Sequence, residues 1–166
     1  MKRIQLYALG MAISLTLFSA AAMAVPPNHP SITGTYKLVS RTGKDNSVKT
    51  APNVIGLQTF TKTYRNFNVA WTDANGKTFS YSVISRYTLT DTTYTETKLY
   101  SIMDDEISGA GVKYDFTSQS KTVPVTYQTG KLTFKLPFDP VSVVFEGDKM
   151  VATGDTDFID SWSKVR

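Results

Sequence analysis

The feature that most constrains the fold of this chain is an alternation of apolar and polar residues with a period of two, from about residue 33 to the end. Successive side chains of a strand point to opposite faces of a sheet, so this period indicates strands and not helices. Threonine, tyrosine, valine and phenylalanine, which favour strands, are heavily used. The pattern predicts an all-β chain of about ten strands, drawn from eleven candidate segments at residues 35–41, 54–61, 66–72, 79–89, 93–102, 112–117, 123–127, 132–136, 141–145, 150–153 and 158–165.

Short turn sequences separate the expected strands, at residues 73–76, 90–91, 128–130 and 147–148. Strands joined by so few residues pair antiparallel with their neighbours in the chain. Their even spacing fits a barrel or a sandwich, and we favour the barrel because closure removes the unpaired edges of a sheet. We therefore expect a single antiparallel up-and-down β-barrel of about 8–10 strands, whose interior is filled with side chains or holds one small ligand.

Residues 1–24 have the three parts of a secretory signal peptide. Lys2 and Arg3 are basic, residues 4–18 are mostly apolar, and Ala22-Met23-Ala24 is a small-x-small cleavage site. The apolar stretch is shorter than the about 20 residues that a membrane-spanning helix needs. We expect cleavage after Ala24 and a periplasmic or secreted protein. An extended proline-rich leader at residues 25–32 and one domain at residues 33–166 would follow.

Charge and residue content exclude several classes of function. The chain has 18 basic and 14 acidic residues, and loss of the signal lowers the net charge to about +2, which gives nucleic-acid binding no support. Without cysteine there is no disulfide, thiolate nucleophile or thiolate zinc site. The single histidine, His29, lies in the expected leader, so a Ser-His-Asp triad lacks its base. We expect no catalysis, no cofactor and no metal site.

An outer-membrane barrel fits the same export signal and strand number. Its lipid-facing rows should be continuously apolar. If the aromatic rows face inward, Lys37 and Arg41 face the lipid; if the rows are reversed, Glu96 and Lys98 do. A charged residue there costs about 2–4 kcal/mol at the bilayer midplane. We therefore favour a barrel with no integral membrane segment after removal of the signal.

The two ends of the β-region resemble the lipocalins and the wider calycin superfamily. Residues 34–39 are similar to the Gly-x-Trp opening of that family, with Tyr36 in place of tryptophan, and residues 160–166 look like the closing strand of bacterial lipocalin-like domains. The resemblance implies that Gly34 starts the first strand, that Tyr36 plugs the closed end of the barrel, and that Arg166 covers its ring. Trp162 and Lys164 would share the strand face of Arg166. It also implies an internal pocket for a small apolar or amphipathic molecule.

Two neighbouring rows of polar and aromatic side chains form the candidate ligand site. Tyr81 and Tyr87 lie on one expected strand and Glu96, Lys98 and Tyr100 on the next, and Trp71 ends a third row. If these rows point inward, hydroxyls, a carboxylate and an ammonium enter an aromatic cavity, which is the composition of a site that orients one ligand. The same pattern also fits a structural ion pair between Glu96 and Lys98. Arg65 and Arg86 are further candidates, for a ligand carboxylate.

The leading hypothesis is an exported barrel that binds or carries a small hydrophobic or amphipathic ligand. The first alternative is a structural or protein-interaction module with a filled interior, which would contact an unknown protein partner through an outer face or the expected loop at residues 104–111. The second is a Tyr/Glu/Lys-based isomerase or cyclase, since some calycins have such activities. Fold alone does not decide among them.

Overall fold

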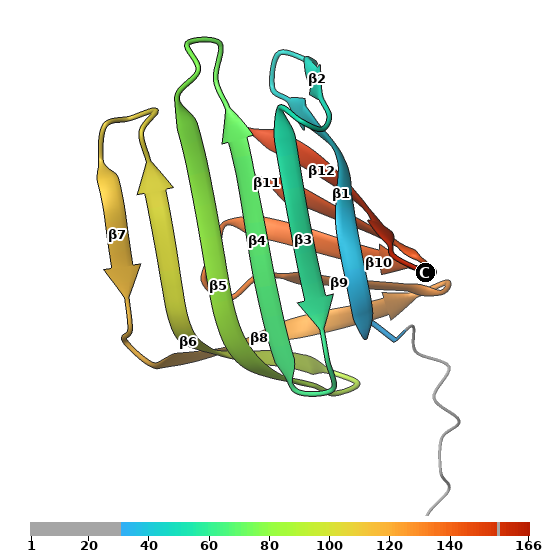
Figure 1. Cartoon of the computed structure of the whole chain (residues 1–166). Helices are drawn as coiled ribbons and strands as arrows, with labels where there is room; N and C mark the ends of the chain where they lie inside the picture. The colour runs from blue at the N-terminus through green and yellow to red at the C-terminus, as the bar shows by residue number, and fades with distance from the viewer. Residues whose placement is uncertain (1–30, 156) are drawn as a thin grey trace, which may run out of the picture.

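The computed structural model describes residues 31–155 and 157–166, so the expected signal peptide and nearly all of the expected leader lie outside the described residues. The described part of the chain holds no helix long and apolar enough to cross a membrane. It forms twelve strands (Figure 1): β1 (Gly34–Gly43), β2 (Val48–Lys49), β3 (Val54–Phe60), β4 (Tyr64–Thr72), β5 (Thr78–Leu89), β6 (Thr93–Asp105), β7 (Gly111–Asp115), β8 (Gln119–Gln128), β9 (Lys131–Lys135), β10 (Val141–Glu146), β11 (Lys149–Gly154) and β12 (Phe158–Lys164).

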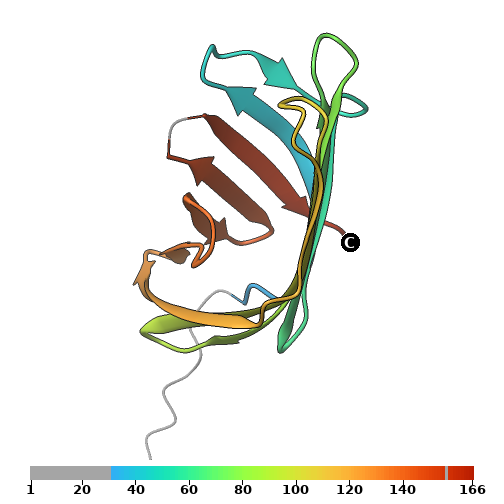
Figure 2. The same ribbon diagram turned by 90° about the vertical axis from the view of Figure 1, so that its left-hand side faces the viewer.

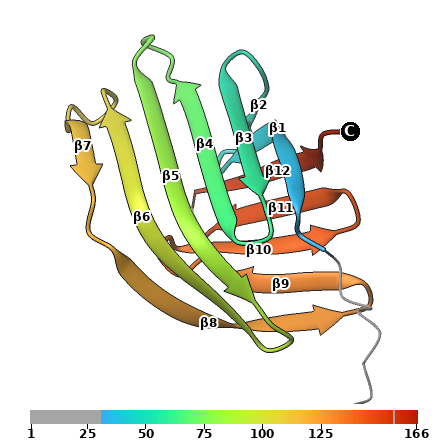
Figure 3. The same cartoon turned by 60° about the horizontal axis from the view of Figure 1, so that its bottom comes forward.

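Ten of these strands close into a barrel, in the order β1, β3, β4, β5, β6, β8, β9, β10, β11 and β12, with β12 paired to β1. Every pairing is antiparallel, which confirms the predicted all-β, up-and-down barrel. Figures 1 and 2 show two walls, one of β1 and β3 to β7, the other of β9 to β12 crossing at a steep angle. Figure 3 shows β8 curving from β6 to β9, so that it joins the walls.

The predicted turns connect paired strands. Residues 73–77 lie between β4 and β5, and residues 90–92 between β5 and β6. Thr129 and Gly130 both have positive φ, 49° and 77°, between β8 and β9. A two-residue hairpin of this type matches the right-handed twist of the strands that it joins.

Two strands lie outside the closed barrel: the short β2, which pairs with β1, and β7, which the sequence placed in the meander. Residues 112–117 were expected between two barrel strands, but β7 pairs with the second half of β6 and with no other described strand. The first half of β6 pairs with β8. The expected loop at residues 104–111 is shorter than predicted, because β6 continues to Asp105 and residues 106–110 form the hairpin to β7.

Aromatic rings fill one end of the barrel around Tyr36, whose side chain is fully buried. Its ring meets Phe60 and Phe145 edge to face, with centroids 6.3 and 5.7 Å apart. Edge-to-face pairs place a positive ring edge against a negative ring face and so stabilise the core beyond simple burial. Burial, with the charge of Asp148, raises the pKa of Tyr36 to about 12.

The cation over Tyr36 is Lys164 and not Arg166, which corrects the role inferred from the family resemblance. Lys164 pairs directly with Tyr36 across β1 and β12, and its Nζ lies 5.8 Å from the ring centroid. Arg166 lies beyond β12, where its exposed guanidinium donates to Asp148 at 3.2 Å. The strand ends before it can bring Arg166 back over the barrel.

Two glycines make room for large side chains at this seam. Gly34 has φ +143°, and a Cβ there would come within 2.2 Å of Lys164 Cε, so the bare backbone lets the lysine cross the strand. A Cβ on Gly56 would come within 2.7 Å of the ring of Trp162, which is buried beside β3. Glycine is the residue that permits such close approach.

Candidate functional site

A cavity of about 270 Å³ opens inside the barrel, between β3 to β5 on one side and β10 to β12 on the other. Most of its lining is aromatic or aliphatic, including Phe67, Trp71, Phe79, Val143, Met150 and Trp162. Both tryptophans of the chain are therefore in the wall. Ligand pockets typically combine such an apolar lining with a few polar groups that fix orientation.

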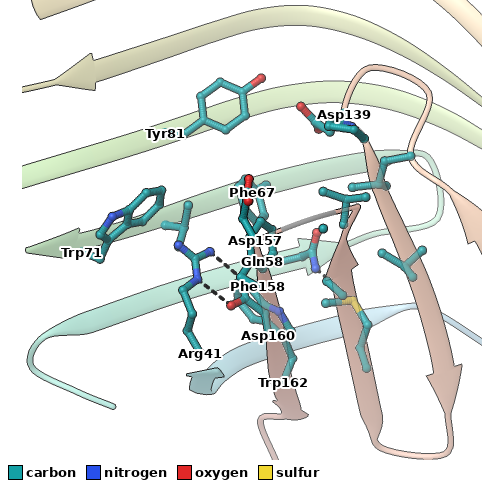
Figure 4. A pocket seen from close by; sticks show the side chains of 18 of the residues that line it. Arg41, Gln58, Phe67, Trp71, Tyr81, Asp139, Asp157, Phe158, Asp160 and Trp162 are labelled. Carbon is teal, nitrogen blue, oxygen red and sulfur yellow. Dashed lines mark hydrogen bonds and ion pairs between the residues drawn. The ribbon is translucent and has the colours of Figure 1, made fainter. Parts of the chain in front are cut away.

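Arg41 on β1 and Asp160 on β12 form an ion pair in the wall of the cavity (Figure 4). The guanidinium donates from Nε and Nη2 to the two carboxylate oxygens, each at 2.7 Å. Its carbon lies 4.2 Å from the Trp71 ring centroid and 4.4 Å from that of Phe158. This bidentate pair between two rings balances the charge of Arg41 and fixes its plane.

A second, fully buried network centres on Glu96. Arg65 donates to Glu96 Oε1 at 3.1 Å and Ser85 Oγ donates to the same oxygen at 2.5 Å. The Tyr94 hydroxyl donates to Oε2 at 3.0 Å, and Arg65 Nε donates to Gln58 at 3.0 Å. Burial alone would lower the pKa of Arg65, but the nearby anionic groups, above all Glu96, raise it above its ordinary value.

Asp139, in the loop between β9 and β10, is a further acid of the cavity wall and is less exposed than Asp155 and Asp157, which also line it. Its carboxyl lines the cavity and points into it from the side opposite Tyr81 (Figure 4). In the described part of the chain no hydrogen bond or ion pair reaches that carboxyl. Burial raises its pKa, and the charges of Arg65 and Lys98 offset this only in part. The hydroxyl of Tyr81 is bonded to Ser101, and burial together with Asp139 raises the pKa of Tyr81 to about 12.

Of the six residues predicted to bind a ligand, the structure places Trp71 and Tyr81 in the cavity wall. Tyr87 is core: its ring packs on Phe60, and its hydroxyl donates to the carbonyl of Thr61 at 2.5 Å. Glu96 lies behind the wall, where it holds Arg65. Tyr87 thus belongs to the aromatic core, Glu96 belongs to the buried network around Arg65, and neither residue lines the cavity.

Lys98 and Tyr100 are separated from the cavity. Lys98 pairs with Asp115 at the end of β7, so the ion pair considered between Glu96 and Lys98 is wrong: each has a different partner. A register shift in the pairing of β5 with β6 places Tyr100 opposite Ile84, on the outer face, where its ring meets Phe116 at 5.4 Å. Tyr100 therefore lies on the face opposite to Glu96.

Arg41 and Asp139 were not identified as residues of the site from the sequence, but Arg65 was named as a candidate. Arg41 was assigned to the outer face, but a bulge between Leu38 and Ser40 turns it inward to Asp160. Asp139 lies in a loop that carries no periodic signal. Of the two arginines named as ligand candidates, Arg65 is buried against Glu96, and Arg86 is exposed.

The described residues contain no group of three or more acidic or histidine side chains arranged to hold a metal ion. At the end of β6, the Asp105 carboxylate accepts from the amide and hydroxyl of Ser108. Glu106 accepts from the amide of Thr78 at 2.9 Å. These carboxylates organise the hairpin to β7.

Asp139→Asn is expected to stabilise the ligand-free protein at pH 7.5. The folded-state pKa of this carboxyl lies above its ordinary value of 3.8, so the native state loses stability as the pH rises from 3.8 through the folded-state pKa. The stability difference between variant and wild type should therefore be positive at pH 7.5 and vanish below pH 3.8. Urea unfolding across this range measures it, with the exposed Asp157→Asn as control. A variant no more stable than wild type at pH 7.5 contradicts the expectation.

No protein-family model, no curated protein and no solved structure matches this chain. The geometry described above therefore carries the functional conclusion.

Proposed function

We propose that this protein is a lipocalin-like binding protein that takes up a small apolar or amphipathic molecule inside its barrel. The observation that supports it is the cavity of about 270 Å³ with a mainly aromatic and aliphatic wall. A barrel whose interior is filled by its own side chains would contain only scattered voids about the size of a water molecule. The proposed role is binding, without a reaction. Export by the segment at residues 1–24 is part of this proposal.

Burial of apolar surface would supply most of the affinity. Removal from water stabilises a complex by about 0.8 kcal/mol for each buried methylene. Polar groups in the wall would set the orientation, because a buried polar group of the ligand must find a partner. Arg41 is already held by Asp160 between two rings, so this part of the wall is rigid before a ligand arrives. A preorganised wall loses less entropy on binding.

Octan-1-ol should bind to the wild-type protein in a saturable way. Because both tryptophans line the cavity, their emission should shift as the alcohol displaces water, and isothermal titration calorimetry gives the affinity independently. Ala152→Phe, which adds a ring to the cavity wall, should weaken binding at least tenfold, about 1.4 kcal/mol.

The matched control is Val151→Phe, the same new ring on the outer face of the same strand, where Val151 is 37% exposed. It should bind octan-1-ol as the wild type does. Near-ultraviolet circular dichroism confirms that both variants are folded. No saturable binding to the wild type, or equal affinity in both phenylalanine variants, contradicts the proposed function.

A second candidate function rests on the outer face of β7. Val112 and Tyr114 on this face are 51 and 62% exposed, Phe116 directly after the strand is 70% exposed, and the ring of Tyr114 stacks on that of Phe116. An exposed apolar patch beside an unpaired strand edge is a typical protein-contact surface. If this is the function, Tyr114→Ser should abolish association with a protein partner and leave octan-1-ol binding unchanged. Partner pull-down with both proteins measures the first effect.

A further inference from the structure

Each arginine of the cavity wall is paired with a carboxylate, whereas the carboxylate of Asp139 has no cation paired with it. Arg41 is matched by Asp160 through two bonds of 2.7 Å, and Arg65 is matched by Glu96 at 3.1 Å. Both cations near the cavity thus have their own carboxylate. A ligand carboxylate would have to compete with an existing buried partner, and breaking a buried pair is costly.

Asp139 has no such partner. No ion pair or hydrogen bond from the described residues satisfies its carboxyl, although it faces the interior. The cationic side chains whose charges act on Asp139 form ion pairs with other carboxylates: Arg65 pairs with Glu96, and Lys98 pairs with Asp115. Carboxylates withdrawn from water are normally paired or hydrogen-bonded, so the unpaired and partly buried carboxylate of Asp139 in the cavity indicates a place for a complementary group.

The groups around Asp139 suit a protonated amine. Across the cavity, the Tyr81 hydroxyl forms a hydrogen bond with Ser101 that lowers its pKa, as a bond donated by Ser101 does, and its oxygen keeps a second lone pair that can accept from an ammonium. The ring of Tyr81 meets that of Phe67 at 6.2 Å, and this aromatic surface favours a cation by its quadrupole. The opposite part of the cavity, with Val143, Met150 and Trp162, is mainly apolar and would hold the body of the molecule, although the buried indole N–H of Trp162 has no hydrogen-bond partner among the described residues.

We propose that the molecule bound in the cavity is an amphipathic amine, whose protonated amino group donates to the carboxylate of Asp139 and whose apolar body lies toward Met150. This inference rests on the proposed function, because it assigns the chemistry of the same cavity. An anionic amphiphile of equal length would place a second negative charge beside Asp139 and should bind less well.

Three probes with the same eight-carbon chain test the proposal: octylamine, octan-1-ol and octanoate, each titrated calorimetrically at pH 7.5. Wild-type protein should bind octylamine at least tenfold tighter than octanoate. Asp139→Asn should weaken octylamine binding at least fivefold and leave octan-1-ol binding within twofold. Asp157→Asn, which removes an exposed carboxylate at the same cavity, should leave both within twofold.

The outcomes separate the two claims. Unchanged octylamine affinity in Asp139→Asn, or octanoate binding tighter than octylamine, overturns the amine proposal while octan-1-ol binding upholds the cavity. Equal losses of octylamine affinity in Asp139→Asn and Asp157→Asn overturn it too. Such a result would show that the amine responds to the overall negative charge of the cavity and not to a contact with Asp139. Failure of all three probes to bind overturns the proposed function itself. Unfolding midpoints of the variants verify that each remains folded at the titration temperature.

Discussion

Glu96→Ala is expected to lower the free energy of unfolding by about 3–5 kcal/mol. The carboxylate holds three donors at once, from Arg65, Ser85 and Tyr94. Arg65 is 3% exposed, so removal of Glu96 leaves a guanidinium inside the barrel without its counter-charge. Urea unfolding, followed by circular dichroism and analysed by linear extrapolation, measures the loss.

The double variant Arg65→Met/Glu96→Leu separates charge from packing. Apolar side chains of similar size can replace a buried ion pair with little cost, because the penalty of removing both charges from water disappears. We expect the double variant to be more stable than Glu96→Ala. A loss below about 1 kcal/mol for Glu96→Ala, the value typical of exposed pairs, would show that water reaches this network.

Phe145→Ala is expected to cost a similar amount, about 3–5 kcal/mol. Phe145 is 1% exposed, and its ring contacts Tyr36, Phe60 and Phe134 at centroid distances of 5.7, 5.6 and 6.0 Å. Alanine would leave a void where strands β1, β3, β9 and β10 meet. Thermal and urea unfolding both report this loss.

The control for Phe145 is Phe116→Ala on the outer face. Phe116 is 70% exposed, and among the described residues its ring meets those of Tyr100 and Tyr114, so its replacement should change the unfolding free energy by less than about 0.5 kcal/mol. Equal losses at the two positions would contradict the placement of the barrel core around Phe145.

The architecture was predictable because its signals are local. Alternation along each strand reports which face is buried, and turn residues such as Thr129 and Gly130 determine which strands pair. The meeting of the two ends of the β-region at Tyr36 is confirmed by the pairing of β1 with β12. The cation over that ring was misassigned, because pairing across a seam depends on register, and the sequence does not specify where the last strand stops.

The faces of Arg41 and Tyr100 were not predictable. In each case one extra residue in a strand reverses the alternation, and every later side chain moves to the other face. Arg41 enters the cavity wall for this reason, and Tyr100 leaves the inner row. Asp139 could not be found by any pattern, since loop residues 136–140 come to the cavity only through the pairing of distant strands.

The most direct test of the central claim is a crystal structure of the protein grown with 8-bromooctan-1-ol, measured at the bromine absorption edge. The account predicts an anomalous peak inside the barrel, within the cavity that Trp71, Val143 and Met150 line. Bromine found only on the outer surface, with side chains or ordered water filling the interior, would contradict it.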